Sequence, residues 1–213
     1  TADNELYAKM PTEEEKRSFR EKYGLAENEP ALLYVGRFSA EKGPKELLKA
    51  LSLVKDPPKL IMIGKGPEKE WCENFAKEKN LPVIFAGYVA NEELYHYYNA
   101  IPIVVIPSVD MPELKEAWSL TVNECMNQGC VVVATESVGA AAGGLVEDGR
   151  TGFIVPERDP EKMAAAIEKL LADKELRETF SKNARTKIAS WDYDHMAEGF
   201  REAVALMEEK LRK

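Results

Sequence analysis

The segment ALLYVGRFSAEKGPKELLKALSLV, residues 31–54, indicates the fold class of this chain. It opens with a short apolar run, passes through a loop rich in glycine and charge, and ends in a stretch with apolar residues every three to four positions. A strand that is apolar on both faces, followed by an amphipathic helix, is typical of a parallel sheet covered by helices. The segment therefore predicts one strand-helix unit of such a sheet.

The same alternation continues over most of the chain. Further apolar runs stand at 60–63, 83–86, 103–106, 131–134 and 152–155. Amphipathic stretches lie between the strands, at 43–54, 67–79, 91–99 and 115–128. Repeated βαβ alternation predicts an α/β fold with a doubly wound parallel sheet, Rossmann-like, and extra C-terminal helices.

Helix caps delimit the remaining parts. Thr12 and Glu15 have the spacing of a capping box, which opens a leading helix that Gly24 ends. Asp159 followed by Pro160 opens a helix over 160–172, and further helices are expected over 174–189 and after Trp191. We therefore expect a leading helix and approach segment at 1–29, a Rossmann-like domain at 30–190 and a C-terminal helix at 191–213. That last helix carries one apolar stripe, made of Met196, Phe200, Val204 and Met207.

Composition excludes several classes of protein. The chain is 45% hydrophobic and 31% charged, which is ordinary for a soluble globular protein. No apolar run reaches the ~18 residues of a membrane span, so we expect a cytoplasmic location. A net charge of -8 argues against a nucleic-acid partner. Because Cys72, Cys125 and Cys130 lack paired spacing and the chain has only two histidines, we expect buried thiols and no metal site.

Open α/β sheets bind ligands at the carboxyl ends of their strands, so the loops after the strands are the places to search. The first loop runs from Gly36 to Gly43 and contains Arg37 and Lys42. A guanidinium and an ammonium near a helix N-terminus suit a diphosphate. The alternative is two solvated cations, with Glu41 as a partner for one of them.

The next two loops carry weaker signals. Gly64 and Gly66, followed by Pro67, allow a tight turn and a close backbone approach to a ligand, although a plain turn is the alternative. The loop matches neither a dinucleotide fingerprint nor a Walker A motif. After the third strand, the backbone of Tyr88 and Val89 could hold a base, while ordinary packing of Tyr88 is an equal alternative.

The loop after the fourth strand carries the strongest signal. Glu116 and Glu124 are separated by seven residues. If a helix begins near Ser119, Glu116 projects from the loop and Glu124 lies further along the helix, so the two carboxylates address different parts of one elongated ligand. The amides of Ser119, Leu120 and Thr121 then point at an anion. The alternative is a pair of solvated charges in a Glu-rich chain.

Taken in order, these motifs resemble a known family. Gly-Arg-x4-Lys-Gly, Gly-x-Gly-Pro, Gly-x-Val, Pro-Ser and Glu-x7-Glu follow successive strands, as in the C-terminal domain of retaining GT-B glycosyltransferases of family 4, glycosyl transferases group 1. The similarity covers about residues 31–191. It implies that 30–190 binds a nucleotide sugar and that an N-terminal acceptor domain lies outside the chain.

The resemblance also implies roles for individual residues. Arg37 and Lys42 would hold the diphosphate and stabilise it as the leaving group, Glu116 would bind the sugar ring and Glu124 the ribose hydroxyls. Backbone near Val89 would hold the base. Donor binding is further expected of Gly36, Gly64, Gly66, Trp118, Ser119, Leu120 and Thr121.

The implied reaction transfers a hexose from a UDP-, GDP- or ADP-sugar to an acceptor hydroxyl. The acceptor hydroxyl attacks on the face from which the leaving group departs, and a phosphate oxygen takes the proton of that hydroxyl. Neither metal nor cofactor is required. The isolated domain would bind donor weakly and transfer nothing, and membrane association would come through the absent domain. The alternatives are a GT-B-fold UDP-sugar epimerase and a non-catalytic nucleotide-sugar-binding module.

Four departures from the family pattern stand out. Ser119 occupies a position where the family usually has glycine, and Val131 one where it often has proline. The loop at 109–115 is longer than usual, and 140–144 replaces the more common Gly-Gly-x-x-Glu. These departures bear on the identity of the sugar and not on the donor fold.

Overall fold

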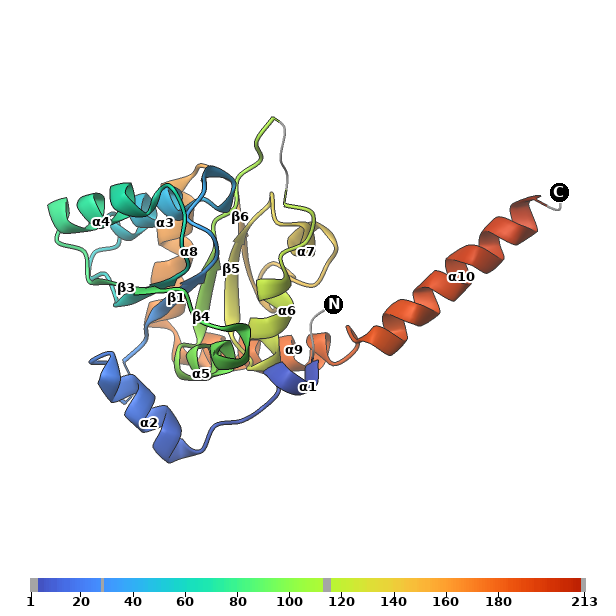
Figure 1. Cartoon of the computed structure of the whole chain (residues 1–213), viewed down its shortest axis with the longest axis horizontal. Coiled ribbons are helices and arrows are strands. Elements are labelled where there is room, and N and C mark those ends of the chain that lie inside the picture. Colours follow the sequence, from blue (N-terminus) through green and yellow to red (C-terminus); the bar gives the residue numbers. More distant parts are fainter. Residues whose placement is uncertain (1–3, 28, 113–115, 212–213) are drawn as a thin grey trace.

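The computed structural model describes residues 4–27, 29–112 and 116–211 (Figure 1). Its centre is a parallel sheet of six strands in the order β3-β2-β1-β4-β5-β6. The strands are β1 Leu32–Val35, β2 Leu60–Ile63, β3 Val83–Gly87, β4 Ile103–Ile106, β5 Val131–Thr135 and β6 Gly152–Val155. The doubly wound parallel fold predicted from the alternating pattern is therefore confirmed, and its strand order reverses between β1 and β4.

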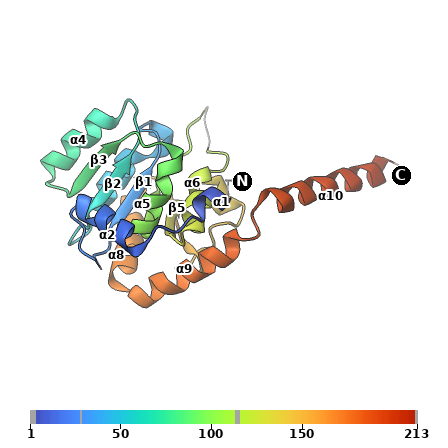
Figure 2. The same cartoon turned by 60° about the horizontal axis from the view of Figure 1, so that its bottom comes forward.

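Helices cover both faces of the sheet. They are α1 Asn4–Tyr7, α2 Glu13–Lys22, α3 Pro44–Leu51, α4 Lys69–Glu78, α5 Leu94–Ala100, α6 Leu120–Asn127, α7 Gly139–Ala142, α8 Pro160–Ala172, α9 Lys174–Ile188 and α10 Tyr193–Leu211, with 3-10 turns η1 Ala40–Lys42 and η2 Asn91–Glu93. One core lies under α1, α5, α6 and α7, and a second lies under α3, α4 and α8. Helix α9 contributes to both (Figure 2).

The short strands are apolar throughout because both of their faces are buried. In β1, Leu33 points into the first core while Leu32 and Tyr34 point into the second. The register continues this alternation, with Leu32 opposite both Leu60 and Ile103. The three thiols are free and buried in these cores, as the sequence predicted.

Local caps also follow the sequence. The Thr12 hydroxyl accepts from the Glu15 amide at 3.2 Å, and the Glu15 carboxylate accepts from the Thr12 amide at 2.7 Å, which completes the capping box of α2. The Asp159 carboxylate caps α8 by accepting from the Lys162 amide at 2.9 Å. These caps confirm that α2 and α8 begin where the sequence placed them.

Two short helices were not predicted. Each of α1 and α7 has four residues, which is too short for an apolar period to be visible in the sequence. Tertiary contacts fix α1 on α6: the Gln128 side chain donates to the Tyr7 carbonyl, and the Asn127 amide donates to Asn4 Oδ1 at 2.9 Å. The N-terminal segment is therefore packed against the helix that carries Glu124.

Helix α10 extends away from the body (Figure 1). Its predicted apolar stripe is exposed, with Met196 at 44% and Phe200 at 67% of their full accessibility. Within the described part of the chain, no helix combines the length and apolar character that a membrane crossing requires.

Candidate functional site

The loops after β1 and β4 meet at the carboxyl edge of the sheet, because these strands are neighbours. Lys42, at the end of η1, forms an ion pair with Glu116 through Nζ and Oε1. The Glu116 side chain is only 5% exposed, and the Lys42 side chain is 27% exposed. The structure thus brings together Lys42, to which the family resemblance assigns the diphosphate, and Glu116, to which it assigns the sugar ring.

A buried serine holds the second oxygen of Glu116. The Ser108 hydroxyl donates to Glu116 Oε2, and Ser108 itself is completely buried just beyond β4. Its carbonyl accepts from the Thr135 hydroxyl at the end of β5. The Pro-Ser motif therefore supplies a fixed donor for the Glu116 carboxylate, a role that the sequence did not reveal.

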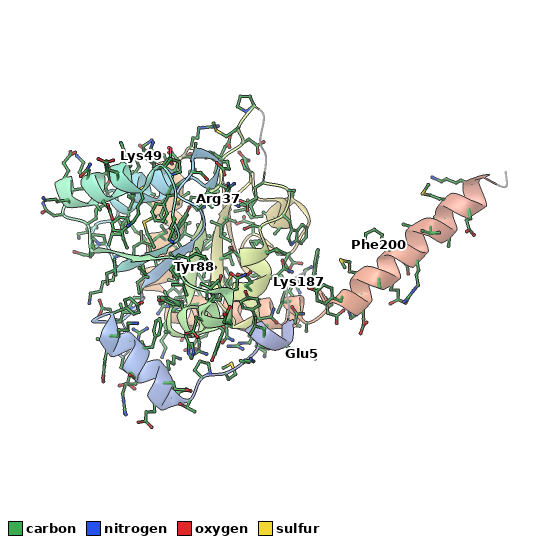
Figure 3. The ribbon with its side chains drawn as sticks, viewed as in Figure 1. Glu5, Arg37, Lys49, Tyr88, Lys187 and Phe200 are labelled. Carbon is green, nitrogen blue, oxygen red and sulfur yellow. The ribbon has the colours of Figure 1, made fainter. Side chains whose placement is uncertain are left out.

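Arg37 has a carboxylate partner of its own. Its Nη2 lies 2.7 Å from Glu41 Oε1, which also accepts from the Ser39 hydroxyl at 2.6 Å. Burial raises the pKa of Glu41, but hydrogen bonds from Ser39 and from its own amide, with the charges of Arg37 and Lys42, hold that pKa below its ordinary value. Glu41 therefore pairs with Arg37, as the alternative interpretation had it, while the Arg37 side chain stays 69% exposed (Figure 3).

Gly64 and Gly66 pack the loop after β2 against the loop that carries Arg37. A Cβ at Gly64 would lie 1.9 Å from the Gly36 carbonyl oxygen, and one at Gly66 would lie 2.4 Å from the Phe38 carbonyl oxygen. The Phe38 amide donates to the Lys65 carbonyl at 2.9 Å across the same contact. The glycines thus fix the shape of the Gly36 loop, and their contact with a donor stays a prediction.

The N-terminus of α6 follows Glu116 by three residues. Helix α6 begins at Leu120 with Ser119 as its N-cap, which agrees with the sequence. Among the described residues, the amides of Leu120 and Thr121 have no hydrogen-bond partner. Such amides at a helix N-terminus are suited to an anion.

Ser119 adopts backbone angles that glycine adopts more readily. Its φ is 75° and its ψ is 91°, and its hydroxyl does not cap α6. A positive φ brings the Cβ of an L-residue close to the following carbonyl. The geometry therefore gives a physical reason for the glycine that the family usually carries at this position.

Trp118 points its ring toward the C-terminal segment. Its Nε1 donates to Asn123 Oδ1 at 2.7 Å, and the ring stacks on Trp191 with 5.0 Å between centroids. These contacts are internal packing. The donor-binding role predicted for Trp118 is not supported by them and stays a prediction.

Glu124 lies in a different environment from Glu116. Its Oε2 accepts from the Tyr98 hydroxyl at 2.7 Å. Burial raises the pKa of Glu124, and hydrogen bonds from Tyr98 and Tyr7 oppose that shift without cancelling it. No sequence pattern pointed to the tyrosines, because their contact with Glu124 depends on how α5 and α1 pack against α6.

The loop after β3 contains the residues proposed for the base. Tyr88 is exposed, with Lys65 Nζ 5.3 Å from its ring centroid (Figure 3). Val89 packs partly against the first core and borders a hollow of about 710 Å³ that Phe19 and Tyr97 also line. In the described residues, no three acidic, histidine or cysteine side chains gather as a metal would need.

Comparison with known proteins establishes the family. Residues 15–187 match the family described as glycosyl transferases group 1. The chain belongs to this family. An α-D-kanosaminyltransferase from Streptomyces kanamyceticus is 33% identical over 178 residues, which are 81% of this chain and 44% of that enzyme. The chain thus spans less than half of that glycosyltransferase.

Solved structures agree with this membership. Sucrose-phosphate synthase from Thermosynechococcus elongatus matches 94% of the chain and 51% of its own length, with a TM-score of 0.76 and 29% identity. The Anabaena protein HepE, in complex with UDP and glucose, matches 97% of the chain and 55% of its own length, with a TM-score of 0.80 and 24% identity. The fold is therefore that of one half of a GT-B glycosyltransferase.

Proposed function

We propose that this chain is the donor-binding domain of a retaining glycosyltransferase that transfers a hexose from a nucleoside diphosphate sugar to an acceptor hydroxyl. The observation that carries the proposal is the meeting of Lys42 and Glu116 beside the N-terminus of α6. A cation and unpartnered helix amides suit a diphosphate, and a nearby carboxylate suits sugar hydroxyls. The UDP and glucose held by HepE support the same ligand class.

In this proposal the chain stabilises the leaving group. The bond between the anomeric carbon and the diphosphate oxygen breaks, and Lys42 and Arg37 neutralise the charge that develops on the diphosphate. The acceptor oxygen bonds to the anomeric carbon from the same face, and its proton passes to a phosphate oxygen. No metal is assigned a step, and the reaction as written needs none.

Glu116 would orient the sugar and not act as a base. Its two oxygens already contact Lys42 and the Ser108 hydroxyl, which fix the direction of the carboxylate. When a diphosphate replaces Glu116 as the partner of Lys42, one oxygen of Glu116 becomes available to sugar hydroxyls. The phosphate and sugar contacts are thereby coupled through one ion pair.

The acceptor site would lie in a domain outside these residues. We further propose that the exposed stripe of α10, including Met196 and Phe200, packs on that domain. The donor domain by itself would then bind nucleotide sugar and transfer nothing, because the opposing wall that excludes water is missing. Any membrane association would come through the same missing domain.

A thermal-shift screen tests the donor assignment. UDP-, GDP- and ADP-glucose, with free glucose as control, are compared on the wild-type chain; a donor at 100 times its Kd stabilises the folded state by about 2.7 kcal/mol. That corresponds to roughly 5–10 °C in Tm for a domain of this size. The proposal fails if none of the three nucleotides raises the Tm at millimolar concentration.

Product analysis on the protein that contains this domain distinguishes the three possible functions. Transfer to an acceptor supports the glycosyltransferase. An isomerised donor without transfer would instead indicate an epimerase. Donor binding with neither product would indicate a non-catalytic module.

A further inference from the structure

Glu124 is a partly buried carboxylate without a cationic partner. It forms no ion pair within the residues described by the structure. Removing a carboxylate from water is costly unless hydrogen bonds replace the lost hydration. The groups that hold this carboxylate therefore determine both its charge and its direction.

Two tyrosines supply those hydrogen bonds. Tyr98, from α5, is 1% exposed and directs its hydroxyl to Glu124 Oε2 at 2.7 Å. Tyr7, from α1, gives the same carboxylate a second hydrogen bond. Burial raises the pKa of Tyr98 well above its ordinary value, so that its hydroxyl stays protonated and donates. The buried Cys125 thiol is a further titratable group beside Glu124, and burial raises the pKa of that thiol well above its ordinary value, so it stays neutral.

We propose that Tyr98, assisted by Tyr7, is a positioning residue that holds the Glu124 carboxylate in place to accept the ribose hydroxyls of the donor. This inference rests on the proposed function. A carboxylate offers about four acceptor positions on two oxygens, so hydrogen bonds from Tyr98 and Tyr7 leave about two positions for a diol. Because the side chain is already fixed, little rotamer entropy is lost when the nucleotide binds.

A neighbouring tyrosine on the same helix offers a matched control. The Tyr97 hydroxyl lies 2.6 Å from the hydroxyl of Tyr23, the residue that follows α2, and not at Glu124. Tyr97→Phe and Tyr98→Phe each remove one oxygen from a buried ring on α5. Only the second removes a hydrogen bond from Glu124.

The test measures affinity for matched nucleotides by calorimetry. UDP, GDP and ADP, each with its 2′,3′-dideoxy counterpart, are titrated into the wild type, Tyr98→Phe and Tyr97→Phe. For the base that the wild type prefers, Tyr98→Phe should weaken the ribonucleotide roughly 10- to 100-fold, the size expected for one hydrogen bond to a charged group. The dideoxy nucleotide should be unaffected. Because Tyr97 lines the hollow beside Val89, any effect of Tyr97→Phe should be equal for the two nucleotides.

The pH dependence adds a readout that a purely structural role would not move. Ribonucleotide affinity should fall at acid pH as Glu124 becomes protonated. Since loss of a donor to the charged form raises a carboxyl pKa, the midpoint of that fall should move up by about one unit in Tyr98→Phe. The Tyr97→Phe midpoint should equal that of the wild type.

The outcomes separate this inference from the proposed function. If the wild type binds none of the three nucleotides, the proposed function fails. The positioning role is tested once the wild type is found to prefer the ribonucleotide to the dideoxynucleotide. The role is overturned if Tyr98→Phe binds both nucleotides with wild-type affinity, or if its affinity for both falls by the same factor. If Tyr98→Phe does not fold, Tyr7→Phe replaces it: a smaller loss confined to the ribonucleotide supports the role, and no loss overturns it.

Discussion

Glu116 and Glu124 belong to one sequence motif, but their carboxylates have different partners in the structure. Glu116 lies at the rim of the sheet, where it shares its oxygens between Lys42 and the Ser108 hydroxyl. Glu124 lies on α6, where its Oε2 accepts from Tyr98 and neutral hydroxyls take the place of a cation. In the donor site that we propose, one end therefore carries charges able to exchange partners, and the other end carries a fixed acceptor.

At the rim of the sheet, Lys42 and Arg37 can exchange a carboxylate partner for a phosphate. Lys42 and Arg37 keep solvent-accessible side chains while their carboxylate partners are largely buried, so a diphosphate can replace Glu116 or Glu41 and leave each cation paired. The Glu124 carboxylate has no such freedom, because losing its hydrogen bonds from Tyr98 and Tyr7 would leave it unsatisfied. The phosphate end should therefore respond mainly to charge, and the ribose end mainly to hydrogen-bond geometry.

The largest effect is expected at Lys42. Lys42→Ala removes a cation from the diphosphate and leaves the Glu116 charge beside it, so affinity for UDP should fall roughly 100-fold, or ~2.7 kcal/mol. Calorimetry measures the loss. Lys45→Ala is the matched control, since Lys45 pairs with Glu68 at 2.8 Å and has similar exposure. Equal losses in the two variants would remove the phosphate assignment.

A smaller effect, with a different ligand dependence, is expected at Glu116. Glu116→Gln should weaken UDP-glucose about tenfold because a charged acceptor for sugar hydroxyls is lost. UDP without sugar should bind as well as before or a few-fold more tightly, because Lys42 no longer has a competing carboxylate. A competition titration compares the two ligands. If UDP and UDP-glucose weakened equally, the division of roles between the two glutamates would be wrong.

Ser119 lies between Glu116 and Glu124, and a substitution there tests whether its backbone is strained. Ser119→Gly should raise the free energy of unfolding by about 0.5–1 kcal/mol, because glycine tolerates the positive φ of this position. Ser52→Gly is the control, since Ser52 has a φ of -68° and should lose stability instead. Denaturant unfolding measures both changes. A lower free energy of unfolding in Ser119→Gly would contradict the claim that the backbone is strained at the N-terminus of α6.

The smallest effects concern pH and have opposite signs at the two ends. The pKa of Glu41 is lowered from 4.5, so its stabilising contribution is present above pH 4.5 and is lost as the pH falls through the lowered value. The pKa of Glu124 is raised from 4.5, so the folded state binds the proton more tightly and stability falls as the pH rises from 4.5 through the raised value.

Melting curves of Glu41→Gln and Glu124→Gln between pH 3 and pH 7 test these signs. As the pH rises, the Tm of Glu41→Gln should fall relative to the wild type, while that of Glu124→Gln should rise relative to it. The expected result is the sign of each difference in Tm, which follows from the direction of each pKa shift. Changes of the same sign in both variants would contradict the comparison.

The sequence predicted the features that depend on neighbouring residues. Apolar runs identified the strands, and the Thr12 and Asp159 caps located two helices. The approach of Lys42 to Glu116 was predictable as well, since a doubly wound topology brings the loops after β1 and β4 to one edge.

The remaining features depend on packing between elements that are distant in sequence. The Tyr98 contact with Glu124 requires α5 against α6, and the short α1 reaches the same carboxylate from the N-terminal segment. The partner of Arg37 could not be decided in advance, because Glu41 and a ligand phosphate satisfy the same charge. Individual residue roles therefore followed from the sequence less completely than the fold did.

A crystal structure of the chain with UDP tests the account most directly. We predict that the diphosphate contacts Lys42 Nζ and the first amides of α6, and that the ribose hydroxyls contact Glu124 while its hydrogen bond from Tyr98 persists. UDP bound elsewhere, with the pair between Lys42 and Glu116 undisturbed, would contradict it.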